Sequence, residues 1–538
     1  MPVHPRNFRP QRRGAQIHPQ KLHWYTLPYE LRIIVLGHLA NHNVQKAERA
    51  SWPSVCAEWR DFFESRAFAC LTLQSSSDIL AFSRLDHHPR DKVKKVRLHV
   101  PLRWYDCTRC DKPENRREAE ANDEAFSVRL LALLHVLTDW QPREDEGLAL
   151  EISTASPSDT QHYFVPPFHT PQEWQDYERG HGSQKGPPDP MTIRGARQRM
   201  LGSPLDLQTT VYHRRDVHGG FKLDIDGLRV PAITQFIVNR ASRRTLSEGA
   251  IRRVFECLPG LKAVTWEPWS GTVAESQRPR ELANLALLAN LPTTVEDLTL
   301  WECWQDPTDM EHEHENASQV RPTGWHASLW RGEEERTSPR FSTSQLMDVV
   351  AAEPMTGHRR MALTAAYACR NLASFNAAGI IDATEFFQNL VLLAEAQPRL
   401  AWSNLKKVAL KTPQVLRTDT REGLFRKAGD AAALIPRLQV MELWDVTANA
   451  GAVFRFRVFE LEAELVLETT MGTELSDDVR ELWDKMARQR GGRHMIVRVR
   501  VLDEDAVRGS RKGFFQRLRL LDPVQMREWN TFKMYESI

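Results

Sequence analysis

Apolar triplets recur along this chain at spacings that constrain its fold more than any other feature. The pattern L-x-x-L-x-L, with other apolar residues allowed, begins at residues 233, 261, 295, 372, 405 and 438, so successive starts lie 28, 34, 77, 33 and 33 residues apart. Four of these gaps are close to one repeat length, and the gap of 77 fits two repeats or one repeat with an insertion. One strand and one helix per unit of this size is typical of a leucine-rich-repeat-like solenoid.

An earlier pair of strands fits the same scheme. Leu71 and Val96, and likewise Leu73 and Leu98, are 25 residues apart, and a short helix over Asp78–Leu85 fits between the two strands. The later triplets are Ile233/Phe236/Val238, Leu261/Val264/Trp266, Val295/Leu298/Leu300, Leu372/Phe375/Ala377, Leu405/Val408/Leu410 and Leu438/Met441/Leu443. We therefore predict an irregular leucine-rich-repeat-like solenoid of strand-helix units over residues 67–445.

The predicted solenoid departs from a regular repeat. The full motif places Asn or Cys three residues after the last apolar position, and only Cys303 satisfies it. Polar insertions are predicted over residues 103–124, 155–205 and 305–342, where loops of a solenoid would carry them. Further alternating strands, together with a helix capped by Ser476, predict a small α+β cap over residues 446–538, because an open solenoid end would expose its core.

Bulk composition excludes several classes of protein. The chain has 538 residues, a formal net charge of +2 and seven cysteines. The near-zero charge predicts no general attraction to nucleic acid or to anionic membrane. Few cysteines, in odd number, favour reduced thiols in the cytoplasm or nucleus. There is no run of 18 apolar residues for a transmembrane helix and no apolar core near Met1 for a secretory signal.

The start of the chain predicts a small helical module. Residues 1–21 are basic and are predicted to be a disordered tail, with a nuclear-import patch as the alternative. Residues 22–66 predict helices: Pro28 and Glu30 suit a first turn, and Leu31, Ile34, Val35, His38 and Leu39 follow helical spacing. Apolar residues cover more than one face, and about 45 residues have too little interior to bury them all.

This module resembles the F-box. The landmarks of that family are a Leu-Pro opening, an acidic residue, an Ile-Leu pair, a closing Leu, and then Val-Cys-x-x-Trp. The chain matches them with Leu27-Pro28-x-Glu30-Leu31, Val35-Leu36, Leu39 and Val55-Cys56-x-x-Trp59. The stretch between Leu39 and Val55 is a few residues longer than usual. Short segments such as Leu258-Pro259-Gly260-Leu261 also resemble the region that follows the F-box in F-box proteins from filamentous fungi. The function of that region is largely uncharacterised.

The resemblance implies a fold and a partner. It implies a three-helix F-box that docks onto the Skp adaptor, and through it onto a cullin, within a Skp–cullin–F-box E3 ubiquitin ligase. The chain would then be a non-catalytic substrate adaptor for protein degradation that holds an unknown target protein on the repeat domain. The implied F-box core and adaptor-binding residues are Leu27, Pro28, Leu31, Val35, Leu36, Leu39, Val55, Cys56 and Trp59.

Two other hypotheses remain open from the sequence. The first is an F-box scaffold that acts with Skp outside a ubiquitin ligase. The second is a cryptic hydrolase or transferase within residues 67–538, although the chain contains no phosphate-binding glycine loop and no Gly-x-Ser-x-Gly elbow. No cofactor is predicted.

Sixteen tryptophans are many for this length, and several follow the predicted strands. Packing in the interior is the simpler interpretation, and aromatic anchors for a target are the alternative. On that alternative, Trp266, Trp301 and Trp444 would bind the target. Cys107-x-x-Cys110 lacks further ligands for zinc, and His312 and His314 lie in an acidic stretch, so loops are favoured over metal sites in both places.

Overall fold

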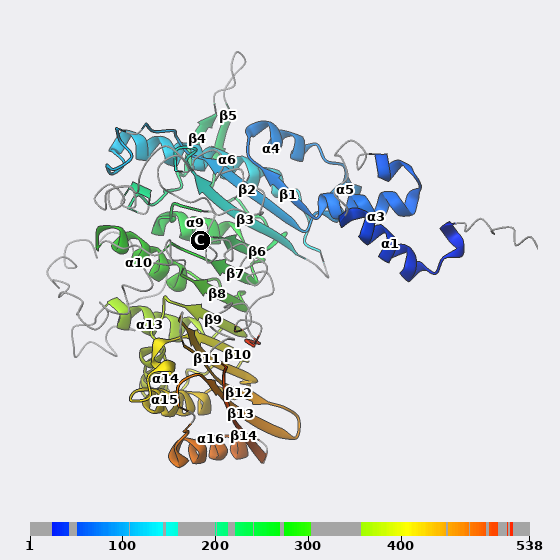
Figure 1. The fold of residues 1–538 in the computed structure, drawn as a ribbon. Helices are drawn as coiled ribbons and strands as arrows, with labels where there is room; N and C mark the ends of the chain where they lie inside the picture. Colours follow the sequence, from blue (N-terminus) through cyan, green and yellow to red (C-terminus); the bar gives the residue numbers. More distant parts are fainter. Residues whose placement is uncertain are drawn as a thin grey trace, which may run out of the picture. The chain divides into compact units, whose positions relative to one another are not determined.

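A computed structural model shows a mixed α/β protein whose main feature is a mostly parallel sheet of 12 strands (Figure 1). It describes residues 24–41, 51–106, 108–143, 147–159, 199–200, 202–213, 221–239, 242–269, 274–302, 357–447, 450–472, 474–490, 494–503, 514 and 517–519. The chain divides into two compact units, one within residues 1–69 and 86–93 and the other within residues 70–85 and 94–538. The predicted tail over residues 1–21 lies outside the described residues.

The first unit is helical. Its described elements are η1 (Trp24–Thr26), α1 (Tyr29–Asn41), η2 (Trp52–Ser54), α3 (Ala57–Phe68) and α5 (His87–Lys92). α5 belongs to this unit because Lys92 Nζ lies 3.0 Å from Asp61 and 3.3 Å from Glu64, both on α3. Pro53 lies in η2, and α3 begins four residues later.

The strands of the second unit follow one another in the sheet in chain order. They are β1 (Cys70–Leu73), β2 (Lys95–Pro101), β3 (Leu148–Ala155), β6 (Ile233–Val238), β7 (Ala263–Trp266), β8 (Asp297–Trp301), β9 (Ser374–Ala378), β10 (Lys407–Lys411), β11 (Val440–Val446), β12 (Gly451–Val458), β13 (Glu462–Thr469) and β14 (His494–Val501). All neighbours pair in parallel except β11 with β12 and β12 with β13. A separate hairpin joins β4 (Thr210–His213) and β5 (Phe221–Asp224).

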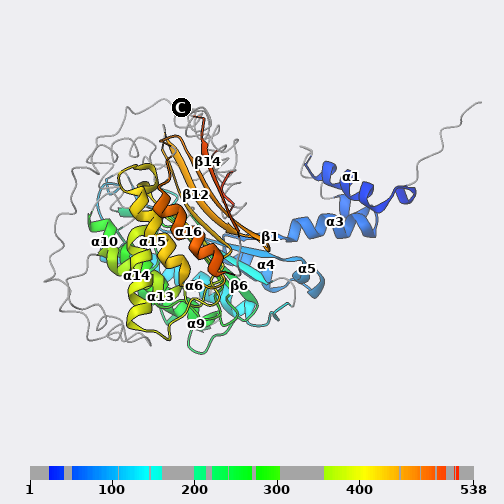
Figure 2. The same cartoon turned by 90° about the horizontal axis from the view of Figure 1, so that it is seen from below.

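Helices alternate with these strands along the chain. They are α4 (Ser76–Ser83), α6 (Arg116–Leu137), α9 (Glu248–Cys257), α10 (Ala274–Ala289), α13 (Gly357–Ala368), α14 (Ala383–Ala396), η4 (Pro413–Leu416), α15 (Arg421–Ala433) and α16 (Asp477–Gln489). Figure 2 shows the helices from α9 to α16 along one face of the sheet. None of the described helices is long and apolar enough to cross a bilayer.

The apolar triplets of the sequence form continuous rows across the sheet. Phe236 pairs with Val264, Val264 with Leu298, and Leu298 with Phe375. The row continues through Val408 to Met441, and in the other direction through Leu150 and Val96 to Leu71. These residues face the helices, as the stacked rings of Phe375 and Phe386 of α14 illustrate. The 25-residue spacing noted near the start of the chain is therefore the pairing register of β1 and β2.

One part of the sequence interpretation is wrong, and the predicted N-cap of α16 is confirmed in position but not in its side-chain hydrogen bond. Residues 103–124 were predicted to be a polar insertion, but residues 116–124 begin α6, whose charged first turns are capped by reciprocal hydrogen bonds between Asn115 and Glu118. Ser476 occupies the predicted cap position of α16, yet its side chain makes no cap hydrogen bond. Its backbone N–H instead donates to Glu422. The predicted cap region also continues the sheet, because β12 pairs directly with β11.

Candidate protein-binding surface

The helix α1 is apolar on two sides. Pro28 accepts the first hydrogen bond of the helix from the Arg32 N–H, and Glu30 places a negative charge in the first turn, where the helix dipole favours it. Between these residues and Asn41 the sequence supplies leucine, isoleucine or valine at six positions. Such a helix needs two apolar neighbours, one for each side.

One side of α1 is covered within the helical unit. Leu36 is fully buried. In the same unit the rings of Trp24 and Trp59 meet edge to face with their centroids 5.5 Å apart, and the rings of Trp59 and Phe63, both on α3, have centroids 5.7 Å apart. Glu58 of α3 accepts a hydrogen bond of 2.8 Å from the Trp24 indole and pairs with Arg32 of α1 at 3.2 Å. These contacts fix α1 against α3.

The other side of α1 is exposed. Leu31, Ile34 and Val35 are 48%, 53% and 39% exposed, and their spacing places them on one stripe of the helix. Further exposed apolar or aromatic side chains in the same unit are Tyr25, Tyr29 and Val55. A cluster of exposed large apolar residues on a small unit is typical of a surface that binds another protein. We call Tyr25, Tyr29, Leu31, Ile34, Val35 and Val55 the apolar surface.

The residues implied by the F-box resemblance divide between the interior and this surface. Leu36 is buried, and Leu27, Leu39, Cys56 and Trp59 are half-buried. Pro28, Leu31, Val35 and Val55 are exposed. Ile34 was noted in the helical spacing but not among the implied binding residues, and Tyr25 and Tyr29 were missed. The signal that could have identified Ile34 was its i, i+3 relation to Leu31.

Cys56 occupies the position just before α3. The backbone N–H of Trp59 and the hydroxyl of Tyr25 stabilise its thiolate and lower the pKa of Cys56. We predict that alkylation of Cys56 by iodoacetamide, followed by peptide mass spectrometry, reaches half its maximal rate at a lower pH in the folded chain than in urea, because the thiolate is the nucleophile. The variant Tyr25→Phe should move this midpoint upward. Equal midpoints in the folded and unfolded chains would contradict the prediction.

The three tryptophans considered as target anchors lie in the interior. Trp266 is buried on the helix side of the sheet, where its indole donates a hydrogen bond of 2.9 Å to Asn284 of α10. Trp301 and Trp444 are buried on the opposite side with their rings stacked at 5.7 Å, and Phe514 and Leu518 belong to the same apolar cluster. Their placement corresponds to the packing interpretation, so they do not present a surface to a target.

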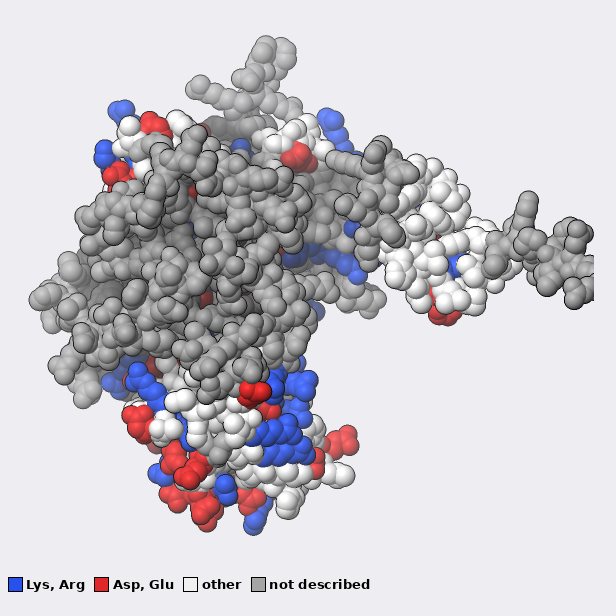
Figure 3. Space-filling view, in the orientation of Figure 1, with Lys and Arg blue, Asp and Glu red and all other residues white. Residues whose placement is uncertain are grey.

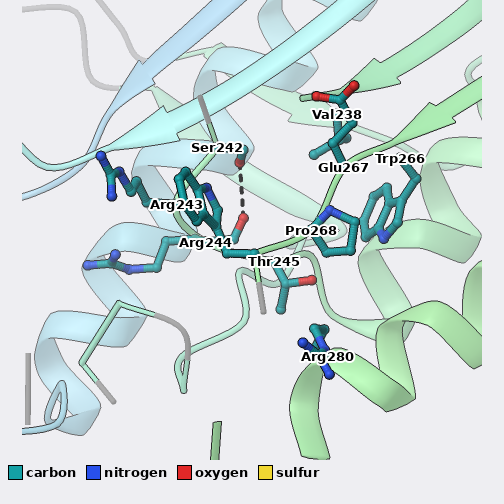
Figure 4. Close-up of a pocket in the computed structure, with 10 residues that line it drawn as sticks. Val238, Ser242, Arg243, Arg244, Thr245, Trp266, Glu267, Pro268 and Arg280 are labelled. Atoms are coloured by element: carbon teal, nitrogen blue, oxygen red, sulfur yellow. Dashed lines mark hydrogen bonds between the residues drawn. The ribbon is translucent and has the colours of Figure 1, made fainter. Parts of the chain in front are cut away.

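A polar pocket lies where β6 and β7 end (Figure 4). Its buried arginines have partners: the Arg243 guanidinium lies 4.9 Å from the centre of the Trp269 ring, Arg244 pairs with Glu114 at 2.8 Å, and Arg280 pairs with Glu302. The enclosed space is about 20 Å³, which is room for about one water molecule. The space that the described residues enclose therefore has no room for a larger substrate.

No group of metal-ligating side chains occurs among the described residues. Cys110 is buried, whereas Cys107, His312 and His314 lie outside the described part of the chain.

The later part of the sheet matches a known protein family. Residues 290–525 match a family of unknown function (DUF6546), a segment that includes β8 to β14. The helical unit with the apolar surface lies outside this match. No curated protein matches the chain.

Proposed function

We propose that this chain is the substrate-receptor subunit of a Skp–cullin–F-box E3 ubiquitin ligase, acting in the cytoplasm or nucleus. The observation that carries the proposal is the apolar surface, since a unit this small exposes Leu31, Ile34 and Val35 on one helical stripe. The resemblance of residues 27–60 to the F-box implies that the Skp adaptor would cover this stripe. An adaptor interface of standard size buries roughly 800 Å² on each side.

The division of residues supports separate roles within the F-box. Leu36, Trp59 and Phe63 would hold α1 on α3, because Leu36 and Phe63 are buried and Trp59 is half-buried. Leu31, Ile34, Val35 and Val55 would insert into the adaptor. A small number of buried anchors usually carries most of the binding free energy of an interface.

The second unit would hold the target. We propose that residues 67–445 form a leucine-rich-repeat-like solenoid and that residues 446–538 close its end. The parallel strands in chain order, with apolar rows in register from Leu71 to Met441, support this description. The receptor itself would break and form no covalent bond. It would accelerate ubiquitin transfer by holding the target near the conjugating enzyme that carries ubiquitin. This proximity raises the effective concentration of the target at that enzyme.

Co-purification with Skp and cullin tests the proposal. The full chain should retain Skp, and with Skp it should retain cullin. Retention of Skp without cullin would instead favour the F-box scaffold outside a ligase, and loss of both would overturn the proposal.

A further inference from the structure

Within the part of the chain that the structure describes, the last strand of the sheet has one edge with no strand paired to it. β14 is the terminal strand of the sheet and, among the described residues, pairs only with β13. It is eight residues long and belongs to a sheet otherwise paired on both sides from β2 to β13. A strand edge of this length is a template for pairing with another extended segment.

The direction of the backbone groups on β14 follows from its pairing. The Leu502 N–H donates to the Thr469 carbonyl oxygen at 2.9 Å, which continues the parallel ladder with β13. Backbone groups on a strand alternate in direction from one residue to the next. The N–H and C=O groups of Val497, Val499 and Val501 therefore point away from β13, to the open edge.

The side chains beside this edge are basic on one face. Arg498 and Arg500 of β14 pair with Glu464 and Glu468 of β13, at 3.2 and 3.5 Å. Each glutamate has a second arginine, since Arg457 contacts Glu464 at 3.1 Å and Arg517 contacts Glu468 at 3.5 Å. Within these ion pairs four arginines face two glutamates, and Figure 3 shows basic side chains gathered over this end of the sheet.

The other face of the edge is apolar. Val497 and Val499 are half-buried beside α16, which packs against β14, and Val501 is 74% exposed. In a peptide strand added at this edge, side chains alternate between the two faces of the sheet. One set would lie beside Arg498 and Arg500, and the other set would lie beside Val497, Val499 and Val501.

We propose that β14 binds an extended peptide in which acidic residues alternate with apolar residues, as an added strand of the sheet. Charge complementarity to the arginines selects acidic side chains on one face, and the valines select apolar ones on the other. Calling this peptide a segment of the target rests on the proposed receptor function, but the binding itself does not depend on the adaptor.

Fluorescence polarisation on the purified full chain tests the inference. The probe is a labelled eight-residue peptide of alternating glutamate and valine, the length of β14. We expect saturable binding that weakens with salt. A peptide with lysine in place of glutamate, and one with the same side chains but methylated backbone nitrogens, should bind at least about tenfold more weakly.

Two variants locate the site. The double variant Arg498→Glu and Arg500→Glu should weaken binding at least about tenfold by reversing the charge. Val499→Pro should have a similar effect, because it removes an N–H that faces the open edge and no hydrogen bond to β13. Circular dichroism and the denaturant midpoint establish that each variant folds, and Arg498→Lys should bind nearly as the parent does.

Equal binding of the glutamate and methylated peptides would overturn the inference, since it would indicate binding by charge alone. Unchanged binding by both β14 variants would also overturn the inference, and so would the absence of saturable binding. In that case Arg498 and Arg500 would serve to prevent the edge strand from pairing with other chains. Replacing Leu31, Ile34 and Val35 should leave peptide affinity unchanged, so failure of adaptor docking and failure of this inference are distinguishable.

Discussion

Replacing Leu31, Ile34 and Val35 together by alanine is expected to weaken Skp binding by at least about a hundredfold. The three side chains are exposed in the free chain, so their truncation removes surface that only a partner would bury. A loss of about 1 kcal/mol at each anchor gives this factor. Alanine has the highest helix propensity, so α1 should be retained. Surface plasmon resonance against immobilised Skp measures the change.

Two controls separate docking from folding. Leu80 of α4 is also an exposed leucine, and Leu80→Ala should leave Skp binding unchanged. Leu36→Ala should lower the free energy of unfolding of the helical unit by about 2–5 kcal/mol, because it opens a cavity in a buried position. If the triple variant binds Skp with parental affinity, the apolar surface is not the adaptor interface.

The variant Arg244→Ala is expected to lower the free energy of unfolding by about 3–5 kcal/mol. Arg244 is fully buried, and its guanidinium lies 2.8 Å from Glu114 and 3.7 Å from Asp159, both of which are also buried. Removing the cation leaves two carboxylates without their charge partner in a region of low dielectric constant. Tyr105 donates a hydrogen bond of 2.8 Å to Asp159 and cannot replace the lost charge. Urea unfolding followed by tryptophan fluorescence measures the difference.

An exposed ion pair nearby supplies the matched control. Arg116 pairs with Glu120 at 2.7 Å on the solvent side of α6, and Arg116→Ala should change stability by less than about 0.5 kcal/mol. Adding Glu114→Gln and Asp159→Asn to Arg244→Ala should recover part of the loss, because the unpaired charges disappear. A loss below about 1 kcal/mol for Arg244→Ala would contradict this account.

The spacing of apolar residues predicted the registers of the sheet because parallel strands in chain order align equivalent positions of successive units. Val408 and Met441 are 33 residues apart and are paired partners. β3 was missed because it falls outside the repeat spacing: Leu150 is 54 residues from its partner Val96 and 86 residues from its partner Phe236. The start of α6 was missed because its charged first turns have the composition of a loop.

The candidate binding surface was only partly predictable. Helical spacing identified the stripe of Leu31, Ile34 and Val35, but not which side of α1 is covered by α3. That choice depends on long-range contacts such as the hydrogen bond from Trp24 to Glu58, 34 residues away. The partners of Arg244 likewise come from segments distant in sequence, and no local pattern marks them.

Because strand order follows chain order from β1 to β14, a nascent chain can complete each hydrogen-bonded ladder as soon as the next strand leaves the ribosome. No strand of the sheet has to wait for a later one to be inserted between its neighbours. The incomplete sheet on the ribosome would therefore present a single growing edge to chaperones, and β14 is the last of the described strands to join it.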